Sequence, residues 1–470
     1  MKRLTCSLLS LLAATGIVAS EVSAENLFAP LNKVYDVDAK SNAYGIRRQG
    51  TGNMNTNLLS EIFNPGRRGV SQVPLQMLDG SQSTLQFRRQ QGTNVDGIQI
   101  VSGVVDGEGH NMATLVNDGG ELRGRIWKDG QLYRLRGDRS GEYSLSEIKN
   151  PNKRVGTDTI DIGKEKVGNQ ASSEQANIPL APEGEPIDIA IMITNKAIKD
   201  LGGEAKAESE LRMLIAETNN IFRQSGITEG NLLRLVGIVP VPFRGSDKLL
   251  LDLGYWKSQK WVMATRNKLG ADLVSFITAP KVTRVCGVGF IGPEPGSPGF
   301  YPEIGYSLSA LECVVADLTF VHEVGHNLGA RHDRYVDGTK GINHGYVNME
   351  KKWRTVMAYS NQCYDNNKLR CPEIPYFSNP GLEYQSKKLG VSGDIDKATD
   401  NASSIKRNIR LIAAYRARAD ANTSSSGKNG RQGTSSLSRP AKVGGIILEP
   451  ASQSQSQAKP RDGKERKIKW

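Results

Sequence analysis

The 470-residue chain has only five histidines and five cysteines. Aromatic residues are also few, with ten phenylalanines against fifty glycines, which indicates a loop-rich, partly β-structured protein. The apolar stretch at the N-terminus is too short to form a transmembrane helix, and no later segment reaches ~18 apolar residues, so we expect no membrane span. At this length, with 38% hydrophobic residues, the chain can form two or three domains with buried cores.

Acidic residues are outnumbered by basic ones, and the formal net charge is +12. Over half of this excess lies in residues 421–470, which carry ten Lys or Arg against three Asp or Glu. We expect residues 419–470, rich in Ser, Gln, Gly and Lys, to form a disordered basic tail. Because this charge lies on a tail and not on a folded face, we expect no specific nucleic-acid partner. Non-specific contact of the tail with polyanions is the alternative.

The first 24 residues have the pattern of a secretory signal peptide, with a basic start, an apolar stretch and a small-residue cleavage site ending at Ala24. We therefore expect an exported protein, extracellular or periplasmic. Four cysteines follow the predicted cleavage site, and an oxidising compartment favours two disulfides among them. Of the three connectivities, we favour Cys286–Cys313 and Cys363–Cys371, because local loops close most easily.

Residues 25–165 lack cysteine and carry many turn signals. The stretch from Asn111 to Arg136 predicts short strands joined by Asp-Gly hairpins, so we expect a β-rich segment. A polar stretch without apolar periodicity follows, and we interpret residues 166–186 as a linker.

From Ile187 onward the pattern predicts alternating strands and helices, and thus an α/β domain over residues 187–418 with a mostly parallel twisted sheet. The expected strands are 187–194, 232–241, 271–278, 285–292 and 310–315. The expected helices are 204–224, 255–269, 316–328 and 401–418, the last capped by Asn401 or Ser403.

Three of the five histidines lie within eleven residues, in "HEVGHNLGARHD". Residues four apart on a helix differ by ~40° in direction, so His322 and His326 project from one face. Gly329 can end the helix in a left-handed conformation, after which the chain can return His332 toward the same point.

Three neutral imidazoles with one open position form the arrangement of a catalytic zinc ion. Zinc makes hydroxide available at neutral pH, and Glu323 is placed to act as general base. A bare His-Glu-x-x-His arises easily by chance, but Gly329 and His332 at three-residue steps make an accident improbable. These side chains would also be costly to bury without a metal. We expect one Zn²⁺, and leave Ca²⁺ open.

The motif resembles the zinc signature of the metzincin metalloproteases, and Asp333 after the third histidine is similar to the reprolysin/adamalysin (ADAM-like) branch. "RTVMAYS" supplies the methionine turn of that family at Met357, and "CPEIPYFSNP" follows it. The resemblance covers about Ile187 to Arg418, roughly half of the chain. It implies a metzincin-like catalytic domain whose active-site helix carries the histidines.

The resemblance also implies roles for residues around the metal. Met357 would form an apolar floor under the histidines without binding the ion. Asp333 would orient the end of the helix and not act as a ligand. Tyr359 has two interpretations, a tyrosine that approaches zinc and steadies the oxyanion, or a core aromatic. We expect His344 to be a surface or loop-anchoring residue and not a fourth ligand.

More weakly, the β-rich segment resembles the propeptides of reprolysin-type enzymes. Because residues 25–186 contain no cysteine, latency through a propeptide thiolate is excluded. An inhibitory segment would have to lie in the cleft or offer another ligand, and the one histidine available, His110, is expected to be structural. Processing would occur in the linker or at Lys153-Arg154.

These expectations describe a monomeric, secreted zinc endopeptidase made as a zymogen and acting on proteins or peptides. The substrate would lie extended along an edge strand near Val288 to Ile291. The alternative is an exported binding or adhesion protein that keeps a metzincin fold with little turnover.

Overall fold

The computed structural model describes residues 21–23, 27–37, 45–63, 70–88, 94–95, 97–149, 158–161, 179–280, 285–293 and 300–419. All of these fall within the compact unit spanning residues 1–431. Nearly all of the predicted signal peptide, residues 166–178 of the predicted linker and the basic tail beyond residue 419 lie outside the described residues. Among the helices that are described, none is long and apolar enough to span a membrane.

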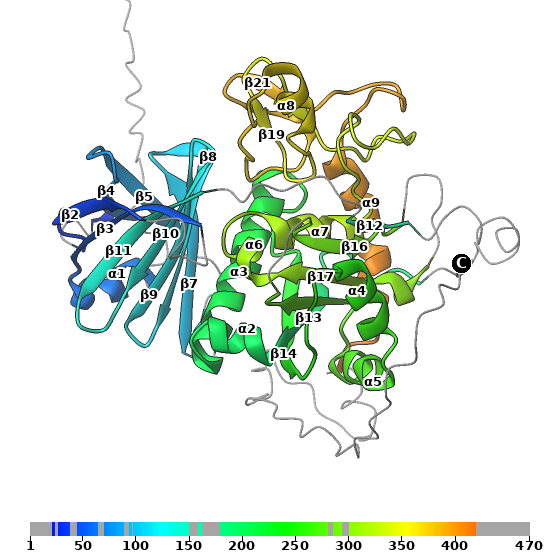
Figure 1. Cartoon of the computed structure of the whole chain (residues 1–470), viewed down its shortest axis with the longest axis horizontal. Coiled ribbons are helices and arrows are strands. Elements are labelled where there is room, and N and C mark those ends of the chain that lie inside the picture. Colours follow the sequence, from blue (N-terminus) through cyan, green and yellow to red (C-terminus); the bar gives the residue numbers. More distant parts are fainter. Residues whose placement is uncertain are drawn as a thin grey trace, which may run out of the picture. The chain divides into compact units, whose positions relative to one another are not determined.

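An eleven-stranded sheet makes up the N-terminal part of the described chain, in the order β1-β4-β5-β7-β8-β9-β10-β11-β3-β2, with β6 paired to β7 (Figure 1). Its pairings are antiparallel except for that of β1 with β4. The strands are β1 Glu21–Ser23, β2 Lys33–Asp36, β3 Ile46–Asn53, β4 Val70–Gln76, β5 Gln82–Arg88, β6 Asn94–Val95, β7 Ile98–Val105, β8 Glu108–Asp118, β9 Glu121–Lys128, β10 Gln131–Gly137 and β11 Glu142–Ile148. Between β3 and β4 lie η1 (Thr56–Leu58) and α1 (Leu59–Phe63).

The hairpins predicted over residues 111–136 are present. Strands β8, β9 and β10 pair in antiparallel register, with Asp118 opposite Glu121 and Lys128 opposite Gln131. The turns between them place glycines and Asp129 at positive φ, as tight hairpin turns require.

A second, six-stranded sheet has the order β12-β16-β17-β15-β13-β14. Its strands are β12 Thr159–Ile160, β13 Ile187–Thr194, β14 Leu233–Val241, β15 Leu273–Thr278, β16 Gly287–Phe290 and β17 Tyr306–Ala310. Among these described strands only β16 and β17 pair antiparallel. The sheet expected to be mostly parallel is thus mixed, and the larger of these two described sheets is antiparallel in all pairings except that of β1 with β4.

Helices cover both faces of the second sheet. They are α2 Asn195–Asp200, α3 Glu204–Gln224, α4 Leu249–Lys257, α5 Lys260–Leu269, α6 Leu311–Val314, α7 Thr319–Asn327 and α9 Asn401–Ile412. Strand β13 is buried along its whole length, with Ile189 and Ile191 in one core with α3 and α7, and Ala190 and Met192 in another with α4. Successive strand residues point to opposite faces, so a strand buried on both sides is apolar throughout.

Smaller elements complete the described chain. The short helix η3 Pro302–Ile304 precedes β17. After β17 come α8 Asn361–Asn367 and two short hairpins, β18 Val347–Asn348 with β19 Trp353–Arg354, and β20 Asn379–Tyr384 with β21 Lys387–Leu389.

Several expected elements differ from those observed. The helix expected over 255–269 is two helices, because Ser258 ends α4 and its hydroxyl donates to the carbonyl of Tyr255. The strand expected over 310–315 is wrong, since β17 ends at Ala310 and the short helix α6 follows. The closing helix is capped by Asp400, whose carboxylate accepts the amide of Ser403, and it ends at Ile412.

The N-terminal sheet packs on helix α3 through a joint apolar core. Met112, Trp127 and Leu132 of the sheet belong to the same buried cluster as Leu211 and Leu214 of the helix. Because this cluster continues into α7, the N-terminal sheet and the histidine-bearing helix share one core.

Candidate metal centre

Helix α7 carries the first two histidines and is fixed to the sheet at its C-terminal end. The side-chain amide of Asn327 donates to the carbonyls of Phe290 at 2.8 Å and Tyr306 at 2.9 Å. Helix α7 begins at Thr319, later than expected, because the Asp317 carboxylate accepts the Thr319 amide at 2.6 Å. Bonds at both ends hold the helix in one place.

The chain reverses immediately after α7 at Gly329. Its φ of +90° is favourable only for glycine, and a Cβ atom there would collide with the carbonyl oxygen of Pro293. The Ala330 amide then donates to the carbonyl of Gly325 at 3.0 Å, which closes the helix end. This turn returns the chain so that His332 faces the helix.

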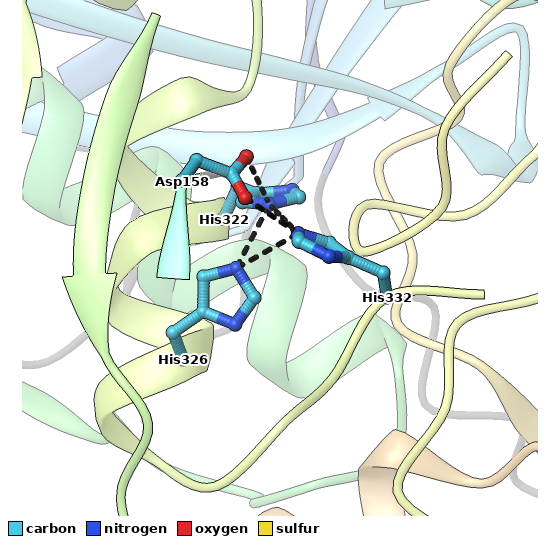
Figure 2. A group of neighbouring side chains, drawn as sticks. All are labelled: Asp158, His322, His326 and His332. Atoms are coloured by element: carbon cyan, nitrogen blue, oxygen red, sulfur yellow. Dashed lines mark hydrogen bonds and ion pairs between the residues drawn. The ribbon is translucent and has the colours of Figure 1, made fainter. Parts of the chain in front are cut away.

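The three histidines converge through their Nε2 atoms (Figure 2). Nε2 of His322 lies 3.1 Å from that of His326 and 3.2 Å from that of His332, and the third distance is 3.1 Å. All three side chains are buried, with residue exposures of 2%, 0% and 7%.

Hydrogen bonds at the opposite ring nitrogens fix the tautomer of the two helical histidines. Nδ1 of His322 donates to the carbonyl of Val356 and Nδ1 of His326 to that of Ala330, each at 2.8 Å. Their Nε2 atoms therefore present lone pairs to the centre. Burial lowers the pKa of His326 to about 3, so this imidazole is neutral at neutral pH, as a metal ligand must be.

This arrangement fits a divalent metal. Lone pairs of neutral imidazoles facing one another repel unless a cation lies between them. Nitrogens that share a tetrahedral zinc at ~2.0–2.1 Å are about 3.3 Å apart, close to the observed separations. A donor set of imidazole nitrogens suits zinc among the common metals.

Glu323 lies beside the histidines on α7, against strand β16. Its carboxylate occupies the space where Gly287 would otherwise carry a Cβ atom, and a Cβ atom at Gly289 would lie 2.9 Å from the Glu323 carbonyl oxygen. Glu323 is 2% exposed. The helix can approach β16 this closely only because that strand has glycine at both positions.

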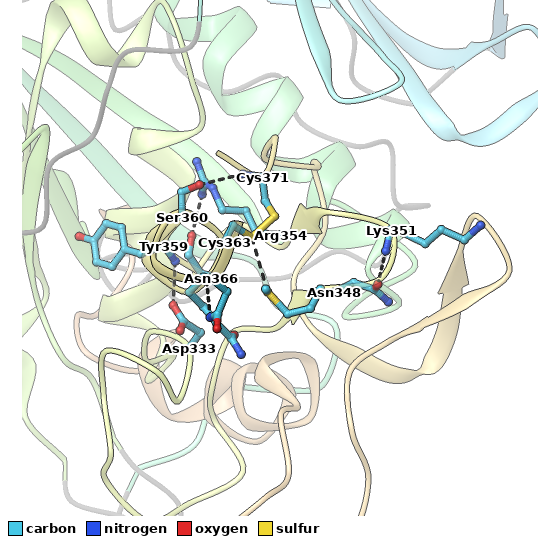
Figure 3. The surroundings of a disulfide bond; sticks show 12 residues. Asp333, Asn348, Lys351, Arg354, Tyr359, Ser360, Cys363, Asn366 and Cys371 are labelled. Carbon is cyan, nitrogen blue, oxygen red and sulfur yellow. Dashed lines mark hydrogen bonds between the residues drawn. A yellow bond between two sulfur atoms is a disulfide. The ribbon is translucent and has the colours of Figure 1, made fainter. Parts of the chain in front are cut away.

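The loop after the histidines lies beneath them, with Met357 fully buried and its sulfur beside Gly325 of α7. Oδ2 of Asp333 accepts the amide of Tyr359 at 2.8 Å, which joins the two loops (Figure 3). Burial raises the pKa of Asp333 to about 6, against the lowering effect of His332. The Tyr359 ring lies 4.6 Å from the His332 ring between centroids.

The remaining two histidines lie outside this cluster. His344 is buried, and its Nδ1 and Nε2 atoms lie 2.8 and 2.9 Å from the carbonyl oxygens of His332 and Thr339. His110 lies in β8 near Glu108 and Asp129, at 3.7 and 3.9 Å.

One residue of the cluster was not predicted from the sequence. Asp158, just before β12, completes the group of potential metal ligands with the three histidines, all ligand atoms lying within 4.8 Å of one another (Figure 2). Nothing in its local sequence marks it, because its place depends on the pairing of a two-residue strand with β16.

Both predicted disulfides are confirmed. Cys286–Cys313 joins the start of β16 to α6, and Cys363–Cys371 closes the segment containing α8 (Figure 3). Ser360 Oγ accepts the amide of Cys371 at 2.9 Å, so this second bridge is tied to the loop that follows Met357.

Comparison with known proteins identifies the same region. Residues 185–386 match the model of the reprolysin-like metallopeptidases of family M12B. A peptidyl-Asp metalloendopeptidase of Stenotrophomonas maltophilia (strain R551-3) is 28% identical over 324 residues, which cover 65% of this chain and 71% of the relative. Its namesake in Xanthomonas campestris pv. campestris is 26% identical over 322 residues, covering 65% and 70%.

Among solved structures, metalloproteinase-II from Bacteroides fragilis aligns with 59% of this chain and 85% of its own, at 12% identity and a TM-score of 0.39. The family match encloses all three histidines, Glu323 and Met357. The chain therefore contains a region, residues 185–386, that matches the reprolysin-like metallopeptidases.

Proposed function

We propose that this protein is a secreted zinc endopeptidase, made as a zymogen in which the N-terminal sheet is the propeptide. One observation carries the proposal: the Nε2 atoms of three imidazoles lie within 3.2 Å of one another. Hydrogen bonds to backbone carbonyls fix the tautomer of two of these rings. The two disulfides support export to an oxidising compartment.

The division of the chain follows the sequence boundaries. We assign residues 1–24 to a signal peptide, 25–165 to the propeptide, 166–186 to the linker, 187–418 to the metzincin-like α/β catalytic domain and 419–470 to the tail. The apolar core shared by the N-terminal sheet and α3 supports a propeptide that remains docked on the catalytic domain until it is cut away.

His322, His326 and His332 would hold the zinc, which as a Lewis acid polarises a carbonyl and makes water more acidic. Glu323 accepts a proton from the attacking water and transfers it to the leaving amine nitrogen. Asp333 and Met357 position the loop under the histidines. Tyr359, beside His332, is suited to donate a hydrogen bond to the oxyanion.

The substrate class follows from the relatives. Because the similar proteins share the name peptidyl-Asp metalloendopeptidase, we propose that this enzyme cuts proteins next to aspartate. The substrate would lie along β16, adding a strand to the sheet.

A direct test uses two peptides that differ only in having Asp or Asn at one position. Their cleavage is measured with the processed wild type, the Glu323→Gln variant and the chelator-treated wild type. We expect the wild type to cut at Asp and the other two to lose activity, Glu323→Gln by at least ~10²–10⁴-fold with its zinc retained. Equal turnover in all three samples would overturn the enzymatic proposal and favour a binding protein that keeps the fold.

A further inference from the structure

A carboxylate from the N-terminal part of the chain lies among the three histidines. Oδ1 of Asp158 is 3.1 Å from Nε2 of His332, and Oδ2 is 3.7 Å from Nε2 of His322. Asp158 is 4% exposed. A carboxylate buried this deeply needs a positive partner, and the point where the three Nε2 atoms converge supplies a place for one.

Backbone pairing holds this carboxylate in position. Strand β12 runs parallel to β16, with Thr159 opposite Gly289 and Ile160 opposite Phe290. The amide of Gly289 donates to the carbonyl of Asp158 at 3.0 Å. The segment therefore occupies the strand edge along which we expect a substrate to lie.

An ion pair fixes the far end of the segment. Nη2 of Arg331, next to the third histidine, lies 2.6 Å from Oδ2 of Asp161. The Arg331 side chain is 6% exposed and that of Asp161 is 52% exposed, so a buried guanidinium holds a carboxylate at the protein surface. One short segment thus contacts the histidine cluster, the edge strand and the arginine beside the third histidine.

We propose that residues 158–161 are an internal inhibitory segment, with the Asp158 carboxylate acting as a fourth metal ligand that keeps the full-length chain inactive. This inference rests on the proposed zinc peptidase function. The group that faces the histidines is a side-chain carboxylate and not a peptide carbonyl, so the segment fills the site without offering a bond to cut. It also supplies a negative charge to a site whose other ligands are neutral.

The position of the segment in the chain allows its release. Asp158 precedes the proposed linker at residues 166–186, so a cut in the linker separates this carboxylate from the catalytic domain. Within the described residues, the segment pairs with β16 over only two residue pairs, so its own backbone contacts with that strand are few.

The test uses the full-length chain carrying Glu323→Gln, which prevents self-cleavage, loaded with Co²⁺ as a spectroscopic probe. A peptide hydroxamate is titrated while its affinity and the visible absorption of Co²⁺ are measured. Asp158→Ala and Asp158→Asn are compared with Glu108→Ala, which removes a 61% exposed carboxylate of the same N-terminal part. Thermal melts establish that each variant is folded, and the isosteric Asn variant is used if the Ala variant is not.

We expect the Asp158 variants to bind the hydroxamate at least tenfold more tightly than the parent and to show an altered Co²⁺ spectrum before it is added. Glu108→Ala should behave like the parent. An unchanged spectrum and equal affinity in folded Asp158 variants would overturn the inhibitory segment while leaving the peptidase proposal intact. Failure of every sample to bind Co²⁺ would overturn the metal site itself.

Discussion

Nε of Arg125 lies 2.8 Å from Oε2 of Glu217, and both side chains are almost completely buried, at 1% and 2% exposure. Arg125 is in β9 of the N-terminal sheet and Glu217 in helix α3. Trp127 donates from its indole nitrogen to the same glutamate at 2.7 Å, and Arg125 also donates to the carbonyls of Val314 and Asp317. The pair is the polar centre of the contact between the sheet and the peptidase region.

Arg125→Met should destabilise the full-length chain by about 3–5 kcal/mol, because it leaves the buried Glu217 carboxylate without its cation. Adding Glu217→Gln should restore part of this loss, since the amide oxygen still accepts from Trp127. Urea unfolding of the parent, the single and the double variant measures both effects. If the double variant is no more stable than Arg125→Met, the loss of stability does not come from the unpaired Glu217 carboxylate.

Glu210 of α3 gives the same contact a pH dependence. Oε2 of Glu210 lies 2.7 Å from Nη2 of Arg136. Burial opposes ionisation of the carboxyl group, but the positive charges of Arg136, Arg134 and Arg123 lower its pKa to about 2 from a usual 4.5. As the pH falls from 4.5 to 2, the unfolded carboxyl gains a proton that the folded one does not, so stability is lost.

The expected loss is about 3 kcal/mol across this window, and above pH 4.5 the contribution is complete. Glu210→Gln should be less stable than the parent at pH 6 and should show a shallower decline below pH 4.5. Melting temperatures at pH 6 and pH 3 test this. Parallel declines in the two proteins would show that Glu210 is not the group responsible.

Gly329→Ala should weaken the metal site through the backbone. The substitution forces an unfavourable φ and a collision with the Pro293 carbonyl, costing about 1–3 kcal/mol and displacing the turn that returns His332. Metal content after dialysis and the melting temperature should both fall. Gly338→Ala, a nearby loop position with open space around it, is the control and should change neither.

Gly287→Ala should displace the Glu323 carboxylate and leave metal binding by the histidines unchanged. A methyl group at this position needs the space that holds the Glu323 carboxylate, so we expect a ~10²-fold lower kcat in the processed enzyme with unchanged metal content. Gly254→Ala, in an open position on α4, should retain wild-type kcat. Loss of metal in Gly287→Ala would point to displacement of the helix instead of the carboxylate.

The elements that the sequence predicted well are those with local signals. Helix α3 shows apolar spacing along its whole length, and the hairpins around β9 have Asp-Gly turns, so neither depends on distant residues. The histidine cluster is equally local, since the helix, the glycine turn and the third histidine lie within eleven residues. Each of these could be inferred from spacing and backbone geometry alone.

The parts that could not be predicted depend on contacts far apart in the chain. Asp158 lies 174 residues before His332, and nothing near it distinguishes it from other exposed-looking aspartates. Breaks in apolar stretches were also missed. Ser258 divides a predicted helix through one side-chain hydrogen bond, and Ala310 ends a strand where apolar residues continue.

The close packing of α7 on β16 has a consequence for how such an enzyme can diversify. With glycine required at Gly287 and Gly289, the strip of backbone nearest the Glu323 carboxylate has no side chain at either position with which to distinguish one substrate from another. New preferences must therefore arise from surrounding loops, which can change in sequence and length while the rigid helix–strand unit, and with it the chemistry, stays the same.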